Sequence, residues 1–100
     1  MSKRVAKKQY IVRTYSAGVF AGEIVSRKKD EVVMRNARRL WRWAGAASLS
    51  QLAMEGVKNP ADCKFPVVIT TDHVLLGVIE IIEMKPAAVK SVAEVPVWGA

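Results

Sequence analysis

The stretch that decides the fold is YIVRTYSAGVFAGEIVSRKKDEVVM, which covers residues 10–34. Residues 10–15 and 19–26 are rich in β-branched and aromatic side chains, and such runs favour β-strands. Small residues at 16–18 predict a turn between the two runs. A polar segment then leads into a third apolar run at 31–34, so the pattern predicts three antiparallel strands joined as a meander.

The stretch over residues 38–43 is compatible with two periods. As a strand it puts alternate residues on opposite faces: Arg38, Leu40 and Arg42 on one, Arg39, Trp41 and Trp43 on the other. As a helix it gathers the same three arginines and Arg35 into one basic stripe. We favour the strand, which extends the meander to residue 43, because alternate tryptophans suit a pleated face and Gly45 follows closely.

Short helices and further strands are predicted downstream. Ser48 and Gln51 form a capping box, which starts a helix that Gly56 can end. Pro86 suits the first position of a second helix. The expected elements are a helix at 48–56, a strand at 65–70, a single helical turn at 71–76, a strand at 78–83 and a helix at 87–94. The predicted class is α+β: a small antiparallel β-sheet, a meander with a barrel-like form as the alternative, and one or two short helices.

Length and composition predict one small domain. The chain has 100 residues, of which 51% are hydrophobic and 25% charged, a composition typical of a folded protein. Residues 1–8 are expected to form a flexible basic arm, and residues 9–100 a single compact domain. Because one small domain buries so much apolar surface with difficulty, we expect a homo-oligomer, at least a dimer.

Positive charge is concentrated in the first half of the chain. The net charge is +7, and residues 1–43 hold 12 basic and 3 acidic side chains against 4 and 6 in residues 44–100. This asymmetry predicts an anionic partner. Cys63 is the lone cysteine, and no apolar stretch is long enough for a signal peptide or a membrane span. We therefore expect a cytoplasmic protein with no membrane partner.

The arginines and tryptophans of residues 36–43 form the candidate binding site. Guanidinium groups match phosphate oxygens, and aromatic faces stack on bases. Arg38, Arg39 and Arg42 would hold phosphate, while Trp41, Trp43 or Tyr15 would stack on a base. The complete candidate set is Arg13, Tyr15, Asn36, Arg38, Arg39, Trp41, Arg42 and Trp43. The alternative interpretation is a mixture of core residues and solvated charges.

The sequence offers little for catalysis. His73 is the only histidine, and nothing around it or Cys63 resembles a nucleophile motif. One histidine and one cysteine do not supply a metal site. Glu80 and Glu83 are better explained as solvated acids on a strand than as a catalytic pair. We therefore expect a binding protein with no catalytic residues, no metal and no cofactor.

Three runs resemble a family of small phage proteins of unknown function: RTYSAGVFAG at 13–22, NARRLWRW at 36–43 and AASLSQLA at 46–53. The resemblance extends over residues 10–83 and implies no established activity. By analogy of size and charge alone, small phage proteins of this kind include sponges that capture cyclic nucleotide signals of bacterial immunity. Those sponges are symmetric oligomers with ligands between subunits. A phage origin would place this protein in the cytoplasm of the host cell.

Two hypotheses of function follow. The first is a non-enzymatic anti-defence sponge that sequesters a phosphorylated nucleotide signal as a homo-oligomer. The second is a phage accessory protein that binds nucleic acid through the basic arm and the arginine–tryptophan cluster. Contact with an acidic host protein is a third, less specific possibility. Affinity for a polyanion falls steeply with salt, whereas capture of one small ligand in a closed pocket is less salt-sensitive.

Overall fold

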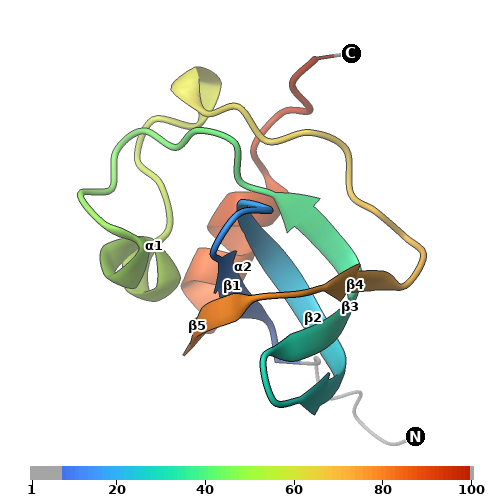
Figure 1. Cartoon of the computed structure of the whole chain (residues 1–100). Helices are drawn as coiled ribbons and strands as arrows, with labels where there is room; N and C mark the ends of the chain where they lie inside the picture. Colours follow the sequence, from blue (N-terminus) through green and yellow to red (C-terminus); the bar gives the residue numbers. More distant parts are fainter. Residues whose placement is uncertain (1–7, 100) are drawn as a thin grey trace, which may run out of the picture.

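The protein is an α+β domain in which one curled sheet carries two helices on one face (Figure 1). The computed structural model describes residues 8–99. Five antiparallel strands lie in the order β4-β3-β2-β1-β5. The elements are β1 (Tyr10–Thr14), β2 (Val19–Lys28), β3 (Glu31–Arg39), α1 (Leu49–Glu55), the 3-10 helix η1 (Pro60–Asp62), β4 (His73–Leu75), β5 (Val78–Glu83) and α2 (Pro86–Ala93). The predicted fold class is confirmed.

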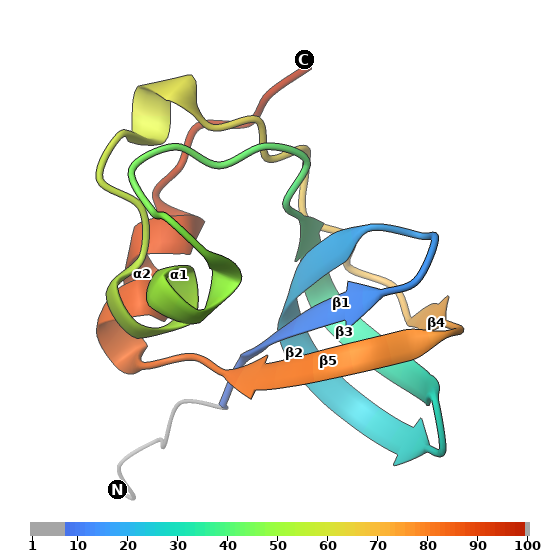
Figure 2. The same cartoon turned by 60° about the vertical axis from the view of Figure 1, so that its left-hand side comes forward.

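The sheet is strongly curled but does not close into a barrel. Its two edges are β4 and β5, although only Leu76 and Gly77 separate these strands in sequence. In a flat sheet the two edges would lie about 19 Å apart, whereas three residue steps span at most about 11 Å. The edges therefore approach each other, and the segment from β4 into β5 runs across the sheet (Figure 2). The Val78 N–H donates to the Asp30 carbonyl at 2.9 Å, which joins this segment to the β2–β3 turn.

The sheet has a separate apolar cluster on each face, as alternation along its strands requires. On β1, Ile11 enters the cluster beneath the helices and Val12 the cluster on the concave face; on β2, Ala21 and Phe20 divide in the same way. The helix-side cluster also contains Leu40, Leu52, Cys63, Phe65, Ala88 and Val92, and the concave cluster contains Val32, Met34, Ala37 and Leu75. The two helices thus cover one face of the sheet, and the other face lines the curl.

A tight crossing of β2 and β3 produces part of the curl. A Cβ added at Gly22 would lie 2.7 Å from the Cα of Ala37, so only glycine allows the two backbones to come this close. Opposite it, Asn36 has a φ of 54°, a left-handed conformation that asparagine tolerates better than most residues. The register of the two strands shifts between Ala21 and Glu23. Such irregularities increase the local bend and twist of a sheet.

The sequence predicted both helices and the strand at 78–83, which is β5, but not the segments between α1 and β5. Ser48 caps α1 through Gln51, Gly56 ends it, and α2 starts at Pro86, as expected. The strand predicted at 65–70 is wrong: that segment makes only isolated bridges, at Phe65 and Ile69. The helical turn predicted at 71–76 is also wrong, because β4 occupies its middle. The strand expected through residue 43 ends at Arg39.

The predicted basic arm falls mostly outside the described residues. Lys8, its last residue, is exposed and lies 3.5 Å from a carboxylate oxygen of Glu83. Within residues 8–99, no helix is both long enough and apolar enough to cross a membrane.

Candidate functional site

Arg38 is a structural residue of the interior. The residue is only 4% exposed. Nε donates to the Pro66 carbonyl at 2.9 Å, Nη1 to the Val92 carbonyl at 2.8 Å and Nη2 to the Phe65 carbonyl at 3.1 Å. Burial lowers the pKa of Arg38, but an arginine remains charged at neutral pH. Since Nε, Nη1 and Nη2 each donate to a backbone carbonyl in the interior, Arg38 is not available to a ligand.

The contacts of Arg38 explain why a cation is placed in this interior. Val92 lies in the last turn of α2, where its carbonyl also accepts from the Val95 N–H at 3.3 Å and where the helix dipole favours positive charge. The other two carbonyls belong to the irregular segment that follows Cys63, which lacks a continuous strand partner. One guanidinium therefore joins β3, this segment and α2, and it replaces hydrogen bonds that a regular sheet would have made.

Arg39 points to the opposite face of the sheet. Its guanidinium carbon lies 4.4 Å from the centre of the Phe20 ring, and Nη1 donates to the Ala17 carbonyl at 2.6 Å. The His73 ring meets the same Phe20 ring edge-on at 4.8 Å. Burial lowers the pKa of His73, and the charge of Arg39 lowers it further. Arg39 is therefore held over the concave core, apart from Arg38.

Trp41 and Arg42 are both turned to solvent by a bulge. The backbone N–H groups of both residues donate to the Lys64 carbonyl, at 3.1 and 3.2 Å, and the Lys64 N–H returns a bond to the Arg42 carbonyl at 2.7 Å. Two residues thus oppose one, which is the arrangement of a β-bulge and interrupts the alternation of faces. Trp41 is 63% exposed, and Arg42 is also exposed. An aromatic ring and a guanidinium are presented side by side in the chain.

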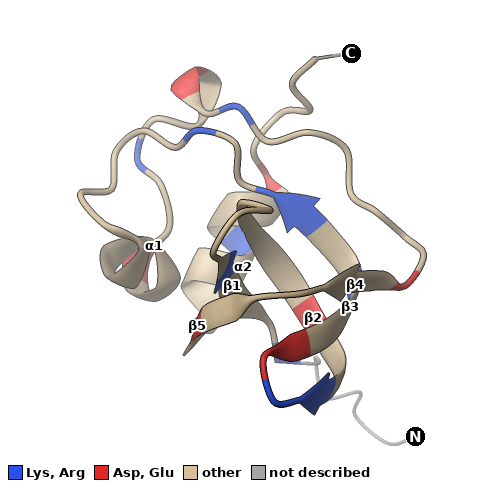
Figure 3. Cartoon of the chain, in the orientation of Figure 1, with Lys and Arg blue, Asp and Glu red and all other residues tan. Residues whose placement is uncertain are grey.

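Two residues from distant segments complete this surface. Lys64, the bridge partner of Arg42, places Nζ 5.3 Å from the centre of the Trp98 ring. Trp98 is 43% exposed, and its backbone N–H donates to the Phe65 carbonyl at 3.1 Å. We call Trp41, Arg42, Lys64 and Trp98 the tryptophan surface. Figure 3 shows basic segments at the end of β3 and on the loops beside it.

The charge of the tryptophan surface is not neutralised by acidic side chains. Across residues 8–99, neither Arg42 nor Lys64 has an ion pair within 4.0 Å. Asp62, two residues before Lys64, makes none either. Two indole rings and two cations therefore remain available to a ligand that contains rings and negative charge.

The remaining predicted residues lie elsewhere. Nε of Arg13 forms an ion pair with Glu80 at 3.0 Å, and Tyr15 is 84% exposed in the turn after β1. The Asn36 amide donates to Glu23 at 3.3 Å. Trp43 is half-buried and packs against the helix-side cluster. The structure therefore brings together only Trp41 and Arg42 of the predicted set.

The candidate set predicted from the sequence contains neither Lys64 nor Trp98. Both residues reach the surface through long-range bridges, Arg42 with Lys64 and Phe65 with Val97. No local sequence pattern predicts such long-range pairings. The residue types alone, a lysine and a tryptophan, are too general a signal to assign this contact.

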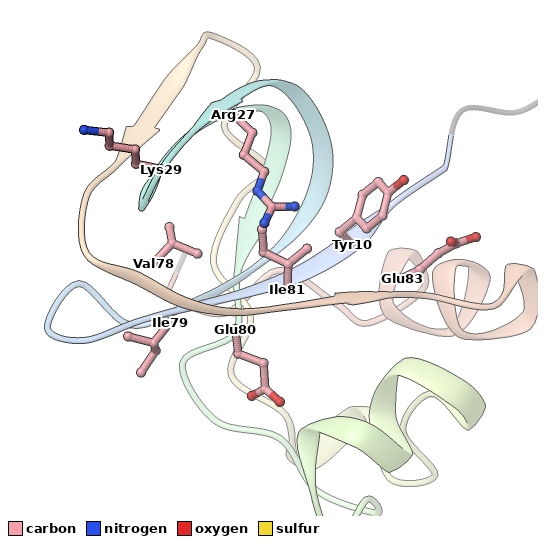
Figure 4. Close-up of a pocket in the computed structure, with 8 residues that line it drawn as sticks. All are labelled: Tyr10, Arg27, Lys29, Val78, Ile79, Glu80, Ile81 and Glu83. Atoms are coloured by element: carbon pink, nitrogen blue, oxygen red, sulfur yellow. The ribbon is translucent and has the colours of Figure 1, made fainter.

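A pocket of about 430 Å³ lies on the other side of the molecule, between β5 and the β2–β3 hairpin. Tyr10, Arg27, Val78 and Ile81 line it together with Lys29, Ile79, Glu80 and Glu83 (Figure 4). The cations of this pocket, Arg27 and Lys29, do not belong to the arginine–tryptophan cluster predicted at residues 36–43.

The reactive side chains are separated. Cys63 is buried in the helix-side cluster, where Sγ accepts from the Ala44 N–H at 3.3 Å. His73 packs on Phe20 in the concave cluster, so these two residues do not form a nucleophile pair. Among the residues that the structure describes, no three histidine, cysteine or acidic side chains come close enough to hold a metal ion.

The α+β domain matches a known protein family. A family model matches residues 7–92, which include every strand and nearly all of α2. The chain belongs to the DUF6948 family. This family is described as a domain of unknown function, so the match shows the family and assigns no activity. The comparisons with curated proteins and with solved structures give no match.

Proposed function

We propose that the protein is a non-enzymatic phage accessory protein that binds single-stranded nucleic acid on the tryptophan surface. The observation that carries the proposal is the bulge that exposes Trp41 and Arg42 beside Lys64 and Trp98. Proteins that bind single strands without sequence preference combine a basic groove with aromatic rings on which bases stack. The net charge of +7 adds attraction for a polyanion at longer range.

The openness of the surface favours a strand over a small nucleotide. Trp41 and Trp98 are 63% and 43% exposed, and an exposed ring offers a face for stacking but no walls. A strand compensates for the missing enclosure by contacting several rings and cations along its length. A sponge for a phosphorylated nucleotide would need a second copy of the chain to close the site, so that hypothesis depends on a homo-oligomer that encloses its ligand.

The test is fluorescence anisotropy with labelled oligothymidylate over a series of salt concentrations. We expect binding that weakens steeply as salt increases, with the logarithm of the affinity falling linearly with the logarithm of the salt concentration. Trp41→Ala should lower the affinity about five- to hundredfold, because stacking contributes about 1 to 3 kcal/mol per base. Tyr15→Ala is the matched control, since it removes another exposed aromatic ring from a different loop.

Two outcomes would contradict the proposal. Equal losses in Trp41→Ala and Tyr15→Ala would show that the tryptophan surface has no special role. Tight binding of cyclic dinucleotides that varies little with salt, together with no binding of oligothymidylate, would instead support the sponge hypothesis.

A further inference from the structure

The pocket between β5 and the β2–β3 hairpin has an apolar floor on the face of the sheet opposite α1 and α2. Tyr10, Val78 and Ile81 are half-buried and pack against the concave cluster. On the opposite face of the sheet, the corresponding cluster is covered by α1 and α2. The volume of about 430 Å³ lies in the range of sites for small molecules.

An aromatic ring and a guanidinium converge above this floor. Tyr10 comes from β1 and Arg27 from the far half of β2, and the curl of the sheet brings them to the same space over Ile81 (Figure 4). Tyrosine offers a flat face to a planar ring, and a guanidinium offers two parallel donors to a phosphate or carboxylate. The two groups suit different parts of one ligand.

The charges around the pocket leave it positive. Glu80 points to the other side of β5 from Arg27 (Figure 4), where it pairs with Arg13 at 3.0 Å. Glu83 lies 3.5 Å from Nζ of Lys8. In residues 8–99, Arg27 and Lys29 have no ion pair within 4.0 Å. The two carboxylates of the lining are thus compensated, whereas the two cations of the hairpin are available.

We infer that this pocket binds a small aromatic anion of the nucleoside monophosphate class. The planar ring stacks on Tyr10 over the floor formed by Ile81 and Val78, and the phosphate is held by Arg27, with Lys29 adding charge at the rim. This site is separate from the tryptophan surface and does not depend on the proposed function. Because the pocket is open to solvent, we expect weak binding that exchanges rapidly.

The experiment is a titration of the isotope-labelled full chain with adenosine monophosphate, followed by NMR chemical shifts. We expect the largest shifts at Tyr10 and Ile81. Arg27→Gln should weaken binding about tenfold or more, because it removes a charge-assisted bond to the phosphate. Lys28→Gln is the matched control: it removes the same charge from the same hairpin, but Lys28 does not line the pocket. We expect less than about a twofold loss for this variant, from general electrostatics alone.

Further arms of the same titration test the aromatic half of the ligand. Tyr10→Phe should retain the affinity and Tyr10→Leu should lose it, and inorganic phosphate alone should bind more weakly than adenosine monophosphate. The inference is overturned if Arg27→Gln and Lys28→Gln weaken binding equally, if phosphate alone binds as well as the nucleotide, or if no pocket residue shifts at millimolar ligand. Shifts confined to Trp41 and Trp98 would overturn it as well, while leaving the proposed function in place.

Discussion

The end of β3 and the loop that follows it use similar residues in opposite ways. Arg38 is buried and donates to three backbone carbonyls, whereas Arg42, four residues later, is exposed without an acidic partner in the described part of the chain. Trp41 and Trp43 differ in the same manner, one exposed and the other packed on the core. Residues that cluster in sequence therefore separate into structural and surface residues according to the distant segments that they contact.

The largest effect is expected from removing the buried member of the arginine pair. Arg38→Leu removes three charge-assisted hydrogen bonds, which contribute about 1.5 to 3 kcal/mol each. The Pro66 carbonyl loses its Arg38 donor, whereas the Phe65 and Val92 carbonyls keep the Trp98 and Val95 N–H groups. We expect the free energy of unfolding to fall by about 3 kcal/mol or more. Urea denaturation measures this loss. Arg42→Leu is the control and should change stability by less than about 0.5 kcal/mol; similar losses in both variants would refute the distinction.

The tryptophans should show the next largest difference. Trp43→Ala removes a half-buried ring from the helix-side cluster, and we expect it to lower the free energy of unfolding by about 2 to 4 kcal/mol. Trp41→Ala removes a ring that is 63% exposed and should change stability by less than about 1 kcal/mol. Thermal unfolding of the two variants separates the roles. A larger loss of stability in Trp41→Ala would place that ring in a contact that our account lacks.

Arg42→Ala should change the salt dependence of oligothymidylate binding and leave the fold intact. Each phosphate contact on a single strand contributes about 0.7 to the slope of log affinity against log salt, so Arg42→Ala should reduce the slope by about that amount. Arg13→Ala removes the same charge from a residue paired with Glu80. An unchanged slope in Arg42→Ala, or an equal reduction in Arg13→Ala, would argue against phosphate contact at Arg42.

The smallest effect concerns the concave face, where His73 and Arg39 share the Phe20 ring. Burial and the Arg39 charge lower the pKa of His73 in the folded protein, so below the ordinary value of about 6.5 the unfolded chain binds more protons. The stability associated with neutral His73 is therefore present above that pH and is lost as the pH falls below it. His73→Gln should show a weaker decline between neutral and mildly acidic pH, measured by urea denaturation; identical profiles would contradict this assignment.

Local signals predicted the parts of the fold that depend on neighbours in sequence. Ser48, Gln51 and Gly56 specify the ends of α1 through backbone contacts within a few residues, and the alternation of β1 and β2 places their side chains on the correct faces. The segment at 65–70 resembles a strand in composition but has no continuous partner, since the chain pairs there only at isolated positions. The carbonyls of Phe65 and Pro66 accept from Arg38 instead, and that of Phe65 also accepts from the Trp98 backbone N–H.

The candidate site was only partly predictable for the same reason. Arg38 carries the residue type of a phosphate ligand, and only the distant carbonyls of Val92 and Phe65 reveal its structural role. Trp41 and Arg42 were predicted from their types, but their exposure depends on a bulge against Lys64, more than twenty residues later. Residue chemistry therefore indicated a class of ligand, and long-range pairing decided which residues can reach it.

The most direct test of the tryptophan surface is NMR of the indole N–H groups during titration with oligothymidylate. The chain has three tryptophans, so each side chain gives a separate signal that substitution assigns. Our account predicts that the signals of Trp41 and Trp98 shift together while that of Trp43 stays in place. Binding that leaves Trp41 and Trp98 unchanged would contradict it.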